Sequence, residues 1–389
     1  MKMEAYLDNS ATTKCSEAVK EIMLEVMMKD FGNPSSLHKK GYEAEAYIKH
    51  AKEQIAKTLK VSEKEIILTS GGTESNNMAI FGAAEANKRE GMHVITTAIE
   101  HASVSAPMKR LEELGYEVTY LGVDENGVIS LEELEAALRD DTILVSMMQV
   151  NNEIGAIEPI EEAAALIKRK NPNTLIHVDA IQSYGKMKIF PKRMGIDMLS
   201  VSGHKLHGPK GVGFLYVKER TKLKPLIYGG GQQKGMRSGT ENVPAIAGLG
   251  VACEEAYGKL EENRKHLYEL KQIFTEKIQE IEDVHINGPL LEEGAPHIVS
   301  VSFGGIDKSE ALLHALEERG IYVSSGSACS SNGKKKNASD TMLAIHQPEK
   351  YQGATLRFSF CPETTVEEIT YTLQVLEEEL PIRRKFTHY

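Results

Sequence analysis

The sequence is poor in several residue types, and each shortage disfavours a class of protein. It contains no Trp, and Phe, Tyr and Trp together make up 6% of its 389 residues, so surfaces that stack nucleic-acid bases are not favoured. Lys and Arg number 46 against 56 Asp and Glu, which gives a formal net charge of −10 and argues against a broad basic face. We therefore expect no direct binding to nucleic acid.

Cysteines and long apolar runs are also scarce. The cysteines lie far apart and form no C-x-x-C pair, being Cys15, Cys253, Cys329 and Cys361. This spacing disfavours a disulfide framework or a structural metal site. Apolar runs such as 142–150 are far shorter than the ~18–20 residues that a membrane-spanning helix needs, and the N-terminus lacks the pattern of a secretory signal. We expect a cytoplasmic protein with free thiols and no membrane association.

Short β-rich runs alternate with longer amphipathic stretches through the first two-thirds of the chain. This alternation predicts an α/β fold in which a large, mostly parallel sheet is covered by helices on both faces. Ligands of such sheets usually bind beyond the carboxyl ends of the strands. The predicted strands are 65–69, 93–97, 117–121, 142–147, 174–178, 198–201 and 213–217, and the predicted helices are 73–87, 102–114, 130–138 and 160–170.

A different pattern begins after Gly250. A long charged helix is predicted over 253–281, followed by strands near 298–303, 320–324 and 355–360 and by helices over 308–318 and 366–379. This second region predicts a smaller α+β domain, with an exposed lysine-rich loop at 333–337. We place the large domain at 14–257 and assign 1–13 and 258–389 to the small one.

A glycine turn follows the first predicted strand and opens a helix. Gly71 and Gly72 would let the backbone approach an anion, and the helix that begins near Thr73 would offer unpaired N–H groups to a phosphate. The turn matches neither the Walker A loop nor the dinucleotide fingerprint. An ordinary glycine turn capped by Thr73 is the alternative.

Two later strands also end in charged residues. Asp179 follows a buried apolar run and needs a cationic partner, which could be a protonated heterocyclic nitrogen, an Arg or a metal. Lys205 enters a glycine-rich turn, where desolvation would lower its pKa as imine chemistry requires. Ser202 and His204 beside it are candidate phosphate ligands. His204 and His207 lie in a broken turn with no third ligand nearby in sequence, so we expect no metal site.

Three further residues complete the predicted chemistry. His101 falls at the same sheet edge, and a phosphate cradle, an Asp, a Lys and a ring-covering His together describe a site for pyridoxal phosphate. Cys329 lies in a small polar loop followed by lysines, which favour the thiolate, although it could be an inconsequential surface cysteine. Arg357 lies in an apolar strand, where its planar fork would suit a substrate carboxylate.

With these motifs the chain resembles the pyridoxal-phosphate-dependent cysteine desulfurases nearly from end to end. The Ser-Gly-Ser-Ala-Cys loop is similar to that of the NifS/IscS-like group, group I. The resemblance implies a fold-type I, aminotransferase-like transferase that forms a homodimer. The matching segments are 6–13, 32–36, 69–77, 149–155, 177–182, 202–205, 237–242 and 325–329.

The resemblance also implies a role for each site residue. Lys205 would bind the cofactor covalently and then move the Cα proton of the substrate. Asp179 would pair with the ring nitrogen, Gln182 would hydrogen-bond the ring oxygen O3′, and His101 would stack on the ring and relay a proton. The phosphate would be held by Gly72, Thr73, Ser202 and His204, with Thr240 from the other subunit.

The implied reaction converts L-cysteine into L-alanine. Asn152 and Arg357 would hold the substrate carboxylate, and Cys329 would take the sulfur as a persulfide and pass it to an acceptor protein. An iron–sulfur scaffold and a tRNA-thiolation enzyme are both open as acceptors. The alternatives are a selenocysteine lyase, another fold-type I enzyme such as a transaminase, and a non-catalytic scaffold. A transaminase needs no loop thiol, and a scaffold would need a ligand cluster.

Overall fold

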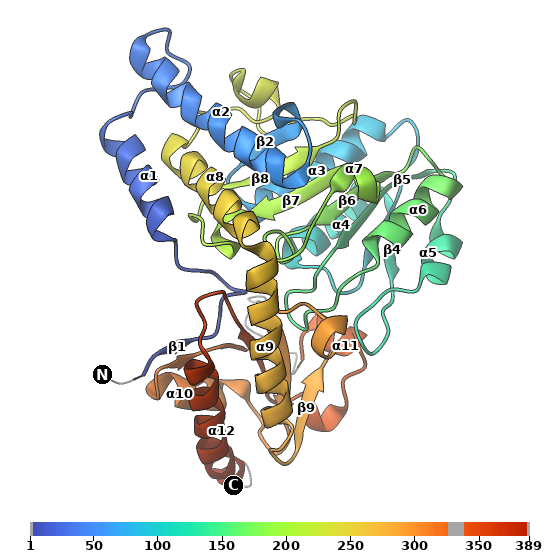
Figure 1. Ribbon diagram of the computed structural model, residues 1–389. Coiled ribbons are helices and arrows are strands. Elements are labelled where there is room, and N and C mark those ends of the chain that lie inside the picture. Colours follow the sequence, from blue (N-terminus) through green and yellow to red (C-terminus); the bar gives the residue numbers. More distant parts are fainter. Residues whose placement is uncertain (1–2, 326–337, 387–389) are drawn as a thin grey trace.

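The computed structural model describes residues 3–325 and 338–386, and it contains a large and a small β-sheet connected by a long helix (Figure 1). In the large sheet β8 runs antiparallel to both of its neighbours, whereas all the other neighbouring strands pair in parallel. The predicted α/β fold with a mostly parallel sheet is confirmed. The strand order is β2 (Ile66–Thr69), β8 (Gly213–Val217), β7 (Met198–Ser202), β6 (Leu175–Asp179), β5 (Thr142–Met148), β3 (His93–Thr97) and β4 (Glu117–Leu121).

Helices cover both faces of this sheet because its strands are apolar on both sides. Successive side chains of a strand point to opposite faces, so Ile66 and Leu68 enter one core and Ile67 enters the other. The second core is closed by α3 (Gly72–Asn87) and α4 (Ala102–Glu113). The first core is closed by α1 (Glu17–Met28), α2 (Lys39–Leu59), α5 (Leu131–Ala137), α6 (Ile160–Lys170), α7 (Pro191–Met194) and α8 (Val243–Gly258).

The smaller unit has a core of its own around an antiparallel sheet. Its strand order is β12 (Ser324–Ser325), β13 (Thr355–Ser359), β10 (Ile298–Phe303) and β9 (Val284–Asn287). Ala5 and Leu7 from the N-terminus belong to this core, next to the parallel pair β1 (Ala5–Tyr6) and β11 (Ile321–Tyr322). The predicted boundary at 257/258 stays a prediction, and the separate cores support it. The helices of this unit are α9 (Leu260–Ile278), α10 (Ser309–Glu318), α11 (Asp340–Ala344) and α12 (Val366–Phe386).

The helix expected over 253–281 is wrong as a single element. The chain instead forms α8, which ends at Gly258, and α9, which begins at Leu260, with Lys259 between them at φ −122° and ψ 20°. Glycine is a poor helix former, which is consistent with the end of α8 at Gly258. The polar, charged composition continues across the break, so the sequence pattern did not reveal the break. Several elements were not predicted at all, among them α1, α2 and β9 and the short 3₁₀ turns η1 (Glu63–Glu65), η2 (Gly203–Lys205), η3 (Gln232–Gly235), η4 (Leu291–Glu293) and η5 (Glu349–Tyr351).

The helices of the described residues were compared with the requirements for crossing a membrane. None of those helices combines the necessary length with sufficient apolar character. The lysine-rich segment 333–337, expected to be an exposed loop, lies outside the described residues.

Candidate active site

The carboxyl ends of three strands meet at one edge of the large sheet. Thr69 at the end of β2 and Ser202 at the end of β7 both pair with Gly213, the first residue of β8. Asp179 ends β6, which pairs in parallel with β7. Parallel strands present their carboxyl ends at the same edge, so the glycine turn after β2, Asp179 and the turn carrying Lys205 come together there, as predicted.

The glycine turn after β2 has the shape of an anion site. Gly71 has φ +145°, a conformation that favours glycine, and a Cβ on Gly72 would lie only 2.2 Å from Ile181 Cδ1. Ser202 is also close, because its Oγ lies 3.6 Å from the position of a Cβ on Gly71. The helix α3 begins at this turn, and the first N–H groups of a helix have no intrahelical acceptor. The turn therefore offers several donors to a phosphate.

Asp179 is a buried carboxylate that accepts two neutral donors. Its Oδ2 accepts from Asn76 Nδ2 at 2.8 Å and its Oδ1 accepts from the Ile181 N–H at 3.0 Å. Burial raises the pKa of Asp179, whereas these hydrogen bonds and the nearby His101 and Lys205 lower it. A protonated ring nitrogen is the kind of partner that stabilises such a carboxylate in its charged form.

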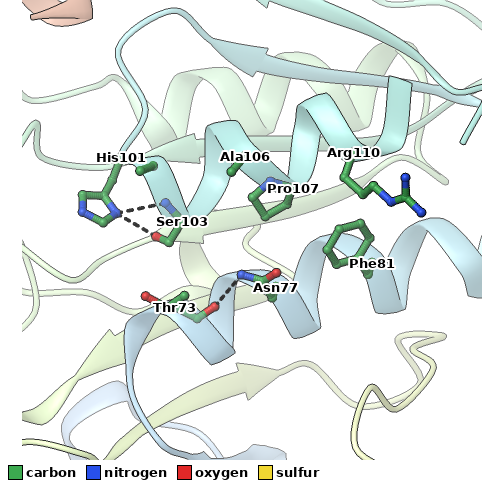
Figure 2. Close-up of a pocket in the computed structure, with 9 residues that line it drawn as sticks. Thr73, Asn77, Phe81, His101, Ser103, Ala106, Pro107 and Arg110 are labelled. Atoms are coloured by element: carbon green, nitrogen blue, oxygen red, sulfur yellow. Dashed lines mark hydrogen bonds between the residues drawn. The ribbon is translucent and has the colours of Figure 1, made fainter. Parts of the chain in front are cut away.

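His101 is connected to Asp179 by a chain of hydrogen bonds. Asn76 Nδ2 donates to Ser103 Oγ at 2.8 Å, and the Oγ of Ser103 lies 2.8 Å from His101 Nδ1, which also accepts from the Ser103 N–H at 3.1 Å (Figure 2). A ring nitrogen that accepts hydrogen bonds carries no proton, so the neutral ring carries its hydrogen on Nε2. Burial lowers the pKa of His101, which favours this neutral form.

A cavity of ≈ 430 Å³ extends from His101 along the groove between α3 and α4. Figure 2 shows Thr73 and His101 at one end of this cavity and Phe81 and Arg110 at the other. Thr73 lies in the first turn of α3, and His101 is the N-cap residue of α4. Two predicted cofactor residues from different helices therefore line one pocket.

Lys205 lies at the end of η2, and its amine contacts the N-terminal segment. Its Nζ donates to the carbonyls of Ser10 at 2.6 Å and Ala11 at 2.7 Å. Gln182 Nε2 donates to the same Ser10 carbonyl at 3.0 Å, so the two predicted residues meet. Burial, together with the positive charge of nearby lysines including Lys205, lowers the pKa of His204 to about 4. These positive charges fit the phosphate that the sequence predicts here.

Arg357 and Asn152 are in direct contact. Arg357 Nη1 donates to the Asn152 carbonyl at 2.7 Å, and Nη2 donates to Asp8 Oδ1 at 3.0 Å. Among the described residues the buried Arg357 Nε has no hydrogen-bond partner, and an unpaired buried donor is costly. Arg357 thus retains a donor for an anion such as a carboxylate.

Two predicted site residues are placed less fully. Thr240 is exposed, between η3 and α8, and its segment is attached to the first turn of α3 by an ion pair of 2.9 Å between Arg237 and Glu74. Cys329 lies outside the described residues. The predicted roles of Thr240 and Cys329 stay predictions.

Sequence reasoning assigned no role to several residues that organise the site. Asn76 and Asp8 fall inside segments that carried the family resemblance, which was the available signal. Ser103 and Lys186, whose Nζ donates to the Lys205 carbonyl at 2.9 Å, gave no such signal because their importance depends on which distant residues they contact.

Comparison with known proteins shows the family of the chain. Residues 5–372 match the family described as Aminotransferase class-V. The chain belongs to the aminotransferase class-V family. It is 43% identical over 390 residues to "Cysteine desulfurase IscS" of Dictyoglomus turgidum, covering 100% of this chain and 98% of that protein. It is also 43% identical over 389 residues to "Cysteine desulfurase IscS" of Clostridium botulinum strain Hall, covering 100% and 97%.

Solved structures of similar proteins agree with this class-V assignment. A structure described as a NifS-like protein has a TM-score of 0.92 and 39% identity, covering 98% of this chain and 100% of that chain. A structure described as SspA in complex with cysteine has a TM-score of 0.79 and 36% identity, covering 93% and 100%. Class-V aminotransferases and their desulfurase relatives are pyridoxal-phosphate enzymes, so the cofactor expected from the sequence is confirmed.

Proposed function

We propose that the protein is a cysteine desulfurase that converts L-cysteine into L-alanine and holds the sulfur as a persulfide on Cys329. The single observation that carries the proposal is that Lys205 and Asp179 lie at one edge of the large sheet, and that Asp8 links Arg357 of the smaller unit to Lys205. Asp8 forms this link because it is hydrogen-bonded to Arg357 and lies within electrostatic range of Lys205. The full-length relatives named cysteine desulfurase support the same activity.

Pyridoxal phosphate, when bound, supplies an electron-accepting ring and a carbonyl group that reacts with amines. The Lys205 amine would hold that carbonyl, Asp179 would pair with the ring nitrogen, and Gln182 would donate to the ring oxygen O3′. His101 would cover the ring. Its phosphate would lie against the anion site formed by Gly72, Thr73, Ser202 and His204, with Thr240 of the other subunit.

Asn76 fixes two of these groups relative to each other. One amide nitrogen donates both to Asp179 and to Ser103, which in turn contacts His101. This shared donor would hold the carboxylate and the imidazole in fixed positions relative to each other. Ser103 occupies His101 Nδ1, so the proton that His101 would exchange with the substrate thiol is the one on Nε2.

The remaining groups act on the substrate itself. Arg357 and Asn152 would hold its carboxylate, and the Lys205 amine would take up the Cα proton. The Cys329 sulfur would then attack the substrate sulfur, so that an S–S bond forms as the C–S bond breaks. Cys329 is left as a persulfide, and the carbon skeleton leaves as alanine. Of the two thiol protons, one is accounted for on the persulfide and the other on the methyl group of alanine.

We propose a homodimer, with the sulfur passed on to an acceptor protein. Several large apolar side chains are exposed on the single chain, and a second subunit would cover them, which supports the homodimer. They are Leu24, Met28, Phe31, Leu37 and Tyr228. The acceptor is an iron–sulfur scaffold or a tRNA-thiolation enzyme, and the relatives' name IscS supports the scaffold. A cytoplasmic location stays a prediction, supported by free Cys15, Cys253 and Cys361.

The function is tested by incubating the purified holoenzyme with L-cysteine and a reductant. We expect alanine and sulfide to appear in equal amounts, and a visible absorption band of the bound cofactor to change when cysteine is added. Measuring the rate with L-selenocysteine in parallel distinguishes a cysteine desulfurase from a selenocysteine lyase. A colourless protein that binds no pyridoxal phosphate, or a protein that acts on selenocysteine alone, would contradict the proposal.

Replacing Arg357 with Gln is expected to weaken substrate binding. Loss of a hydrogen-bonded charge costs about 1.5–3 kcal/mol, so kcat/KM should fall by about 10- to 150-fold, mainly through KM. Arg357→Lys should recover only part of this loss, because an ammonium lacks the planar fork. Steady-state kinetics with cysteine measure the effect.

A matched control is Arg319→Gln. Arg319 pairs with Glu378 and Glu379 on the surface of the same unit, so its loss should leave KM unchanged. The cofactor band should be retained in all three variants, which shows that the site is folded. An unchanged KM in Arg357→Gln would mean that another group holds the carboxylate.

A further inference from the structure

Three potential metal ligands meet where the two units of the protein touch. His207 follows the turn that carries Lys205, whereas Cys361 and Glu363 lie between β13 and α12 of the smaller unit. One donor atom from each lies within 4.8 Å of the other two. Sequence reasoning set His207 aside because no third ligand was nearby in the chain, and the fold supplies two from its opposite end.

The imidazole of His207 is oriented for binding an ion. Its Nδ1 lies 2.9 Å from the carbonyl of Lys14, and a carbonyl can only accept, so Nδ1 carries the hydrogen. The lone pair is then on Nε2, which lies 3.4 Å from Glu363 Oε2. A hydrogen bond from the second ring nitrogen to a carbonyl is the usual way in which proteins orient a metal-binding histidine.

The cysteine is held in place by a short turn. The Cys361 N–H donates to Thr364 Oγ1 at 3.0 Å, and the Thr364 N–H donates to the Cys361 carbonyl at 3.0 Å. Cys361 is half-buried, and the Glu363 side chain is exposed over 69% of its surface. The sulfur is therefore positioned by the backbone, while the carboxylate can adjust by changing rotamer.

We propose that His207, Cys361 and Glu363 bind a divalent cation of the zinc type, with water as a fourth ligand. Nitrogen, sulfur and oxygen donors together suit Zn²⁺, which is tetrahedral with bonds of about 2.0–2.3 Å. Such bonds separate ligand atoms by roughly 3.5 Å, so the His207–Glu363 pair is already at ligand spacing. The Cys361 thiol releases its proton to solvent as the sulfur–metal bond forms, and no redox change is involved.

The ion would connect the turn of Lys205 with the end of the strand that carries Arg357. His207 lies two residues after Lys205, and Cys361 lies four residues after Arg357. Binding would thus hold the two units together beside the active site. The site is independent of the proposed substrate, because none of its ligands has a role in the proposed reaction.

Cobalt titration of the Cys329→Ala holoenzyme tests the site, because that background removes the loop thiol as a competing ligand. Co²⁺ in a tetrahedral site with sulfur gives d–d bands and a sulfur-to-metal charge-transfer band, read as difference spectra. We expect one ion per chain and displacement of Co²⁺ by Zn²⁺. Adding Cys361→Ser should remove the charge-transfer band, and adding His207→Gln or Glu363→Gln should weaken binding at least about tenfold.

The matched control is Cys15→Ser, also in the Cys329→Ala background. Cys15 is exposed, and its Sγ contacts the carbonyl of Gly208, next to His207, but it is not part of the cluster. We expect Cys15→Ser to keep both bands, and Zn²⁺ to raise the melting temperature of this variant but not that of Cys361→Ser. A charge-transfer band that survives in Cys361→Ser, or the absence of stoichiometric binding, would overturn the proposal and leave a simple contact between His207 and Glu363.

Discussion

Replacing Lys205 with Ala is expected to abolish both the cofactor absorption band and the formation of alanine from cysteine. Lys205 Nζ reaches the Ser10 and Ala11 carbonyls at the sheet edge that also holds Asp179. Its amine is assigned both the covalent link to the cofactor and the transfer of the Cα proton. Loss of a positioned acid–base group alone costs about 10²–10⁴-fold in rate, and loss of the covalent link adds to this. Visible spectra and alanine release measure the two effects.

Lys222→Ala provides a lysine control for this variant. Lys222 is exposed and pairs with Glu90 at the surface, so its replacement should leave the band and the turnover as they are. If Lys205 itself moves the Cα proton, adding free pyridoxal phosphate to Lys205→Ala should restore no turnover. A Lys205→Ala protein that keeps the band and forms alanine at the normal rate would show that another amine performs the chemistry.

Replacing Cys329 with Ala is expected to separate cofactor binding from sulfur transfer. The band should remain, because the cofactor site is assigned to other residues, whereas sulfide release from cysteine should fall by at least about 10²-fold. The reason is that the sulfur then lacks the thiolate that accepts it, and a thiolate is far more nucleophilic than water. The same assay as for the wild-type enzyme measures this loss.

Cys15→Ala is the corresponding control, since Cys15 is an exposed free cysteine that has no role in the proposed reaction. It should retain full turnover. Mass spectrometry of the wild-type protein after a single addition of cysteine should find one extra sulfur on the peptide containing Cys329. Undiminished sulfide production by Cys329→Ala would refute this residue as the nucleophile.

Much of the fold could be predicted because its signals are local. Strands β3 and β4 and helix α6 have the bounds that the sequence predicted, since apolar runs with charged or turn-forming ends define them within a few residues. Asp179 and Lys205 were identifiable for a related reason. A charge directly after a buried strand is costly unless something pairs with it, so its presence indicates a nearby partner, which a structural ion pair or a ligand could supply.

Long-range contacts could not be predicted in the same way. The hydrogen bond between Arg357 and Asp8 joins residues 349 apart in the sequence. Whether Asn76 donates to Asp179 depends on how α3 packs over β6, and no local pattern records this packing. The break between α8 and α9 at Lys259 was hidden for the opposite reason, because the local pattern continues across it.

The family could be predicted because motifs along the chain resemble those of known proteins. The alternation of strands and helices follows from local periodicity, and the chemical types at the strand ends follow from the cost of burying charge. Which groups meet depends on how the segments pack. The tertiary structure oriented His101 through Asn76 and Ser103, and it brought His207 to Cys361. The physical reason is that packing of the apolar faces sets the distances between segments, and polar contacts across the chain form only where that packing places complementary atoms within reach.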